Sequence, residues 1–278
     1  MRTVLSVAGD ILSEAASRKW FLVLGIGITL FLATMGLSLR MEVVDGALAA
    51  TRLFGRLWSH DIQSADVALR PVFQVASYLI YYCGLAFGIL ACADFGPSLL
   101  SPGRIEQLLA LPVRRWQLLV GTYLGVFTLS LLGAAYGAGG FTLILALKTG
   151  IWTARPLVAA GLASVCFAAL YAPMLAAALF VRSAAFSGFV GGLFFASGLV
   201  ASYRAEISPL FESRLALTVF RSITALLPRV SALADAAASI AGSKAVDTGY
   251  LGQLLVGMLV FGLGALAVGV WRFEQRDF

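Results

Sequence analysis

The fold follows from uncharged apolar stretches, and the longest of them, residues 118–147, reads LLVGTYLGVFTLSLLGAAYGAGGFTLILAL. These 30 residues contain no Asp, Glu, Lys, Arg or His. Because a helix needs about 20 apolar residues to cross the hydrocarbon of a bilayer, we predict a transmembrane helix here that tilts, bends or protrudes. The stretch is typical of a membrane protein.

Five further uncharged runs lie on either side of this stretch. The six predicted spans are residues 20–39, 72–93, 118–147, 157–181, 183–203 and 250–271. Over the whole chain 60% of residues are hydrophobic and only 12% are charged, whereas an average soluble domain has about 25% charged residues. A soluble globule is excluded, and we predict an all-α integral membrane protein with one transmembrane domain over residues 1–278.

Three segments outside the spans have helical apolar periodicity. In the first, the apolar residues recur at helical spacing, which predicts an interfacial amphipathic helix before the first span. They are Val4, Ala8, Ile11, Leu12 and Ala15. The other two lie in the outer segments 40–71 and 204–249. There, residues 42–58 and 211–227 each place apolar residues near one helical face. We expect these two segments to lie on the outer leaflet, to cap a cavity or to hold a periplasmic protein.

The basic residues indicate the partner and the orientation. The chain has 20 Lys and Arg against 14 Asp and Glu, and they are scattered between the apolar runs. This distribution favours anionic lipid headgroups and excludes nucleic acid as a partner. Basic residues that adjoin span ends on one side place both termini in the cytoplasm; they are Arg18, Lys19, Arg114, Arg115, Arg182 and Arg272.

Several kinds of chemistry are missing from the sequence. All six runs lack ionisable Asp, Glu, Lys, Arg and His, which proton- or sodium-coupled carriers usually keep inside the membrane. The single histidine, His60, cannot form a bis-histidine haem site or an HExxH zinc site. No lysine follows a glycine-rich loop, so any ATP is bound by another chain. We therefore predict no catalytic, cofactor-binding or metal-binding residues in this chain.

The most informative segment is the loop 94–116 between the second and third spans. Pro102 and Gly103 begin a short helical pattern and Pro112 ends it. Within it, Ile105, Leu108 and Leu109 share one face, whereas Arg104, Glu106 and Gln107 lie elsewhere. This predicts a two-turn amphipathic helix that either docks into a groove of a cytoplasmic partner or lies flat on the inner leaflet.

Residues 98–125, SLLSPGRIEQLLALPVRRWQLLVGTYLG, resemble the corresponding loop of type-2 ABC permeases, in particular the NosY-like subfamily. The matching positions are Gly103, Ile105, Glu106, Leu108, Leu109, Pro112, Val113, Arg114, Arg115 and Gly121. The order of an interfacial helix, six spans and a closing WRFEQRDF tail is also similar to that family.

The resemblance implies a type-2 ABC exporter-like fold and a permease subunit in the bacterial inner membrane. It also implies a second permease chain, as a homo- or heterodimer, and two copies of a P-loop ATPase that carries ATP and Mg, so this chain itself is not an enzyme. Coupling to the ATPase is expected from Gly103, Arg104, Ile105, Glu106, Leu108, Leu109, Pro112, Arg114 and Arg115.

The sequence does not decide whether such a permease exports a substrate or transmits force to a periplasmic partner. The alternative function is a non-transporting six-span scaffold or assembly factor for a periplasmic partner.

The resemblance further implies a dimer whose central surface comes from the second and fifth spans. Tyrosine hydroxyls in hydrocarbon need hydrogen-bond partners, and phenylalanines provide aromatic surface. We expect these side chains to line the dimer interface or a cavity, with packing inside one chain as the alternative. The candidates are Tyr78, Tyr81, Tyr82, Phe186, Phe189, Phe194 and Phe195.

Overall fold

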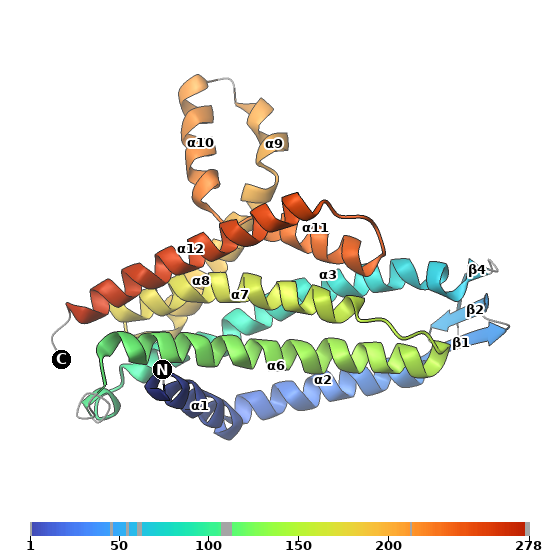
Figure 1. Cartoon of the computed structure of the whole chain (residues 1–278), viewed down its shortest axis with the longest axis horizontal. Coiled ribbons are helices and arrows are strands. Elements are labelled where there is room, and N and C mark those ends of the chain that lie inside the picture. Colours follow the sequence, from blue (N-terminus) through green and yellow to red (C-terminus); the bar gives the residue numbers. More distant parts are fainter. Residues whose placement is uncertain are drawn as a thin grey trace.

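The computed structural model describes residues 2–44, 47–53, 56–59, 63–106, 113–211 and 213–275. Long helices run side by side along the longest axis of the molecule (Figure 1). Both chain ends lie toward one end of this bundle, and a small β-sheet lies at the other end. We call these the terminal end and the sheet end.

Helices make up most of the described chain. Those of the first half are α1 (Arg2–Ser17), α2 (Lys19–Ser38), α3 (Ala65–Cys92), α4 (Phe95–Leu99) and α6 (Arg115–Thr149). Those of the second half are α7 (Arg155–Phe180), α8 (Ala184–Ser202), α9 (Arg204–Ile207), the 3₁₀ turn η1 (Ser208–Leu210), α10 (Arg214–Leu226), α11 (Val230–Ala241) and α12 (Thr248–Glu274).

Six helices in the described residues are long and apolar enough to cross a membrane: α2, α3, α6, α7, α8 and α12. They correspond to the six predicted spans, and they indicate a multi-pass membrane protein. α10 and α11 are bent by 55° relative to each other and together have the composition of one further span. α6, with 35 residues, is about 52 Å long at 1.5 Å per residue, so it exceeds the roughly 30 Å hydrocarbon layer.

The core of the bundle is built around α7. Of the most apolar window of α7, 83% of the residues are buried, against 6% for α2. α7 contacts α3, α6, α8, α11 and α12, and Figure 1 shows it in the middle of the bundle. α2 therefore leaves most of its apolar surface to lipid.

The segment between α2 and α3 corrects one prediction. The described residues between 42 and 58 are not helical; they belong to antiparallel strands β1 (Leu39–Val44), β2 (Ala47–Leu53) and β3 (Arg56–Ser59), and β4 (Gln63–Ser64) pairs with β2. The pairings Val44 with Ala47 and Leu53 with Arg56 leave two residues in each connection. In the sequence these pairs are Asp45-Gly46 and Phe54-Gly55. A glycine at the second position of a short connection is a sequence signal for a hairpin, and the strand pairing agrees with this signal and not with the helical apolar spacing.

The second outer segment agrees better with its prediction. α10 lies within the predicted helical residues 211–227. With α9 it projects sideways from the bundle (Figure 1). Its apolar side chains Leu215, Val219, Ile223 and Leu226 are exposed, so this surface has no cover within the described chain.

Candidate functional site

The candidate site lies at the terminal end, where α1 packs along α6. Two glycines of α6 allow the close approach: a Cβ added to Gly121 would lie 2.7 Å from the Cβ of Val7, and one added to Gly125 would lie 2.8 Å from that of Ile11. Of the predicted apolar face of α1, Val4, Ala8, Ile11 and Ala15 are buried against the bundle, and Leu12 is half-buried. Here α1 is a packed helix of the bundle.

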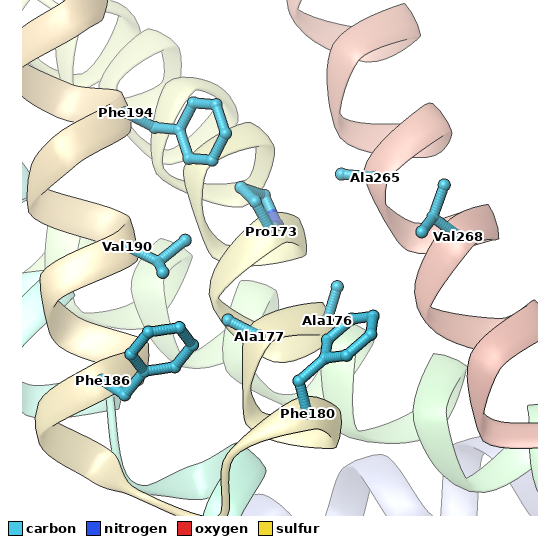
Figure 2. A pocket seen from close by; sticks show the side chains of 9 residues that line it. All are labelled: Pro173, Ala176, Ala177, Phe180, Phe186, Val190, Phe194, Ala265 and Val268. Atoms are coloured by element: carbon cyan, nitrogen blue, oxygen red, sulfur yellow. The ribbon is translucent and has the colours of Figure 1, made fainter. Parts of the chain in front are cut away.

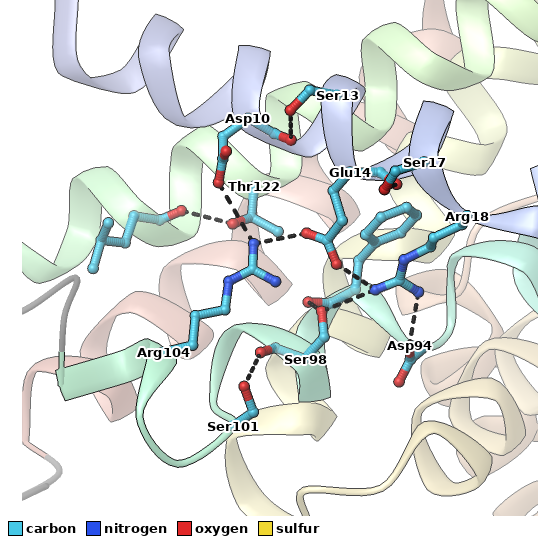
Figure 3. A network of polar contacts seen from close by, with 12 residues as sticks. Asp10, Ser13, Glu14, Ser17, Arg18, Asp94, Ser98, Ser101, Arg104 and Thr122 are labelled. Carbon is cyan, nitrogen blue, oxygen red and sulfur yellow. Dashed lines mark hydrogen bonds and ion pairs between the residues drawn. The ribbon is translucent and has the colours of Figure 1, made fainter.

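The polar face of α1 holds the beginning of the loop 94–116 through Arg104. Its Nη2 donates a hydrogen bond to Oε2 of Glu14 at 2.7 Å. The same nitrogen lies 3.6 Å from Oδ2 of Asp10. These contacts join residues about 90 positions apart, so they connect two separate segments (Figure 3).

Arg18, one helical turn after Glu14, completes the network. Its Nη2 donates to Glu14 and, at 3.3 Å, to Oγ of Ser98, while Nη1 pairs with Oδ2 of Asp94 at 2.7 Å (Figure 3). Its guanidinium carbon also lies 4.5 Å from the centroid of the Phe95 ring. The end of α1 is thereby fixed to the turn that follows α3. We call Glu14, Arg18, Asp94 and Arg104 the elbow cluster.

The charges of the elbow cluster stabilise one another. Partial burial alone would raise the pKa of Glu14, but the hydrogen bonds and charges of Arg104 and Arg18 outweigh it and lower that pKa. Burial likewise opposes the charged form of Arg18, and the contacts with Glu14 and Asp94 still raise its pKa. The carboxylate is therefore ionised at neutral pH, with both guanidinium groups bonded to it.

The described start of the loop is tightly folded. Gly103 has φ +83°, a backbone conformation that favours glycine. The amide of Ile105 donates to the Ser101 carbonyl at 3.2 Å, and the Ser101 hydroxyl donates to the Ser98 carbonyl at 2.8 Å. Ile105 is 3% exposed and packs in the main core.

Two residues of the predicted coupling helix make their contacts within this chain. Because Ile105 is buried inside this chain, it is unavailable to a partner surface and instead holds the loop against the bundle. Arg104 is engaged with Glu14, whereas Glu106 is exposed. Leu108, Leu109 and Pro112 lie outside the described residues.

The far end of the loop is joined to α12. The backbone amide of Arg114 donates to Oε1 of Gln117 at 3.1 Å and so caps the start of α6. Arg115 donates from Nη1 to the backbone carbonyl of Glu274 at 3.3 Å. Since carbonyls at a helix C-terminus carry partial negative charge, this contact ties the start of α6 to the end of α12.

The tyrosines proposed for a dimer surface find partners within the chain. Tyr78 donates its hydroxyl to Oδ1 of Asp235 at 2.8 Å. Tyr81 is almost completely buried and donates to the Val230 carbonyl at 3.1 Å. Both acceptors belong to the region of α11, so the need of these hydroxyls for partners is met without a second copy, and Tyr81 lies outside any exposed surface.

The aromatic residues of α8 divide into two groups. Phe195 forms an edge-on contact with Tyr82 at 6.4 Å between centroids, and Phe194 forms one with Phe261 at 5.2 Å. Phe189 is 65% exposed, and Phe186 lies at the rim of an apolar groove. Of the predicted set, Phe189 is the most available to another molecule.

Sequence reasoning missed the elbow cluster. Glu14 and Arg18 have the i, i+4 spacing of a helical ion pair, which is a visible local signal. Asp94 and Arg104 lie 76 and 90 residues away from their partners, and no local pattern connects them. Only the packing of α1 on α6 brings the four charges together.

In the elbow cluster, charge-assisted hydrogen bonds join three segments, namely the end of α1, the turn after α3 and the loop at Arg104. Such bonds can hold these segments together when one of them moves. Among the described residues no group of three His, Cys, Asp or Glu is placed to hold a metal ion.

No protein-family model matches this chain, and a search of curated proteins finds no match.

Proposed function

We propose that this chain is the membrane permease subunit of an ABC transporter and couples ATP hydrolysis by a separate P-loop ATPase to export or force transmission across the bacterial inner membrane. The proposal rests on the loop resemblance together with six apolar helices and a packed N-terminal helix. The permease pairs with a second permease chain, and two ATPase copies hold ATP and Mg. Both termini are cytoplasmic in this arrangement.

The observation that carries the proposal is the connection of the loop 94–116 to the bundle at both of its ends. At its start, Arg104 bonds to Glu14 of α1, and α1 packs on the glycines of α6. At its far end, Arg115 bonds to the last turn of α12. A displacement of the loop by an ATPase would therefore be transmitted to α1, α6 and α12 together.

The resemblance and the burial of the described residues together suggest roles within the loop. Leu108 and Leu109 are proposed to enter an apolar groove of the ATPase, with the exposed Glu106 and Arg114 at its rim. Arg104 and Ile105 act inside this chain as positioning residues.

The test is retention of an ATPase by the purified permease. The tagged chain is isolated from its native membrane in mild detergent, and bound P-loop ATPases are identified by mass spectrometry. Leu108→Asp should remove the ATPase, because burying an unpaired carboxylate in an apolar groove costs several kcal/mol. Leu108→Met, which keeps an apolar side chain of similar size, should retain it. An ATPase bound equally by both variants would contradict the coupling role.

One further observation favours force transmission to a periplasmic partner over export. The β-sheet lies at the end of the bundle opposite the two chain ends (Figure 1), so it would be on the periplasmic side in the proposed orientation. Deleting residues 47–59, which carry β2 and β3, should then abolish partner capture but leave ATPase binding intact. Loss of substrate movement without loss of a protein partner would favour export.

A further inference from the structure

An apolar groove opens between α7, α8 and α12 near the terminal end. It has a volume of about 330 Å³. Pro173 and Phe180 of α7, Phe186 and Phe194 of α8, and Ala265 of α12 line it (Figure 2). The lining is almost entirely carbon, so the groove suits a hydrocarbon chain.

The position of the groove matches one leaflet of a bilayer. It begins at Phe186, two residues after the start of α8 at Ala184, and extends to Phe194. Eight residues of helix correspond to about 12 Å at 1.5 Å per residue. This is close to half of the roughly 30 Å hydrocarbon layer, the depth that an acyl chain occupies.

A positive charge lies at the terminal edge of the groove. Ala265, Val268 and Arg272 are spaced three and four residues apart on α12, so they share one face. The guanidinium carbon of Arg272 lies 5.5 Å from the centroid of the Phe180 ring. Arg182 follows Phe180 by two residues and is exposed.

Arg272 also has unused hydrogen-bonding capacity. Its Nε is buried and has no hydrogen-bond partner within the described part of the chain. A buried N–H without an acceptor is costly, and a guanidinium group suits a phosphate oxygen. An apolar groove that ends at such a group has the two parts of a phospholipid site.

The geometry points to a binding site for an anionic phospholipid of the leaflet at the terminal end, with an acyl chain in the groove and the headgroup phosphate at Arg272. The positive charge of Arg272 at its edge favours a lipid of net negative charge over a zwitterionic one. This inference goes beyond the proposed function and does not depend on it, because the site is formed by this chain alone.

The test measures lipid binding to the purified full-length chain by native mass spectrometry. The probes are palmitoyl-oleoyl phosphatidylglycerol and the phosphatidylcholine with the same acyl chains. We expect about tenfold tighter binding of phosphatidylglycerol, or about 1.4 kcal/mol. Arg272→Gln should remove this preference. Lys19→Gln, which removes an exposed cation at the same end on α2, should keep it.

A second pair of variants tests the groove separately from its charge. Ala265→Phe fills the groove and should weaken binding of both lipids several-fold, whereas Ala267→Phe, on an exposed position outside the groove lining, should not. Thermal melting confirms that each variant is folded. Unchanged binding by Ala265→Phe and Arg272→Gln would overturn the proposal. So would disulfide cross-linking of Val190→Cys between two copies, which would show a second copy over the groove.

Discussion

Gly125 of α6 lies so close to α1 that a Cβ added to it would be 2.8 Å from the Cβ of Ile11 and 3.0 Å from the carbonyl oxygen of Ala8. Such distances leave no room for a methyl group unless α1 moves. The docking of the N-terminal helix therefore depends on glycine, which has no side chain, at positions 121 and 125.

We predict that Gly125→Ala destabilises the protein by about 1–3 kcal/mol through overpacking. Gly133→Ala, on the same helix with nothing within 4 Å of the added Cβ, should be neutral or stabilise by about 0.5–1 kcal/mol because alanine favours helix. Thermal unfolding in detergent measures both. Equal melting temperatures for the two variants would show that α1 is not held at Gly125.

The sequence predicted the spans because each is a long run without charge. α7, for example, covers Arg155–Phe180, against a predicted 157–181. α3 begins at Ala65, earlier than the predicted residue 72, because it extends through Arg70 beyond the apolar run. The sheet was not predicted, because the apolar residues between 42 and 58 have helical spacing and strand pairing is not a local property of the sequence. The elbow cluster was missed because its members meet only after the tertiary packing of α1.

The pair Glu14 and Arg104 should be energetically coupled. In a double-mutant cycle with Glu14→Gln and Arg104→Gln, we expect a coupling of about 1 kcal/mol, within the range for partly buried contacting charges. Asp10, 3.6 Å from the same guanidinium but more exposed, provides the matched control. The cycle with Asp10→Asn should give a smaller coupling, as is usual for exposed ion pairs. Additive effects of the Glu14 and Arg104 variants would show that the bond contributes nothing to stability.

The elbow cluster should weaken in acid. The folded-state pKa of Glu14 is lowered, so its stabilising effect is fully present above the ordinary glutamate pKa and is lost as the pH falls through the lowered value. A cysteine is introduced at the buried Ala15 in a protein without its native cysteines. Its labelling should increase as the pH falls through the lowered pKa of Glu14. Glu14→Gln should remove this part of the pH dependence. An unchanged pH profile in that variant would assign the acid response to other groups.

The proposed orientation has a direct test. A cysteine at Lys244, exposed after α11, should react with an impermeant maleimide added outside intact cells. A cysteine at Lys19, exposed at the other end of the bundle, should react only after permeabilisation. Both variants are made in a background without Cys83, Cys92 and Cys166. The reverse labelling pattern would invert the topology and exclude a cytoplasmic loop 94–116.

The proposed dimer should cross-link through side chains that this chain leaves uncovered. Leu79 of α3 and Phe189 of α8 are 56% and 65% exposed, whereas Tyr81 is buried and bonded to α11. Single cysteines placed in turn along both helices should form disulfide-linked dimers with helical periodicity. Leu79 and Phe189 should be among the positions that cross-link, and Tyr81 should not. The measurement is non-reducing electrophoresis of native membranes. If no position on α3 or α8 cross-links while the ATPase remains bound, these helices do not form the interface between the two permease chains.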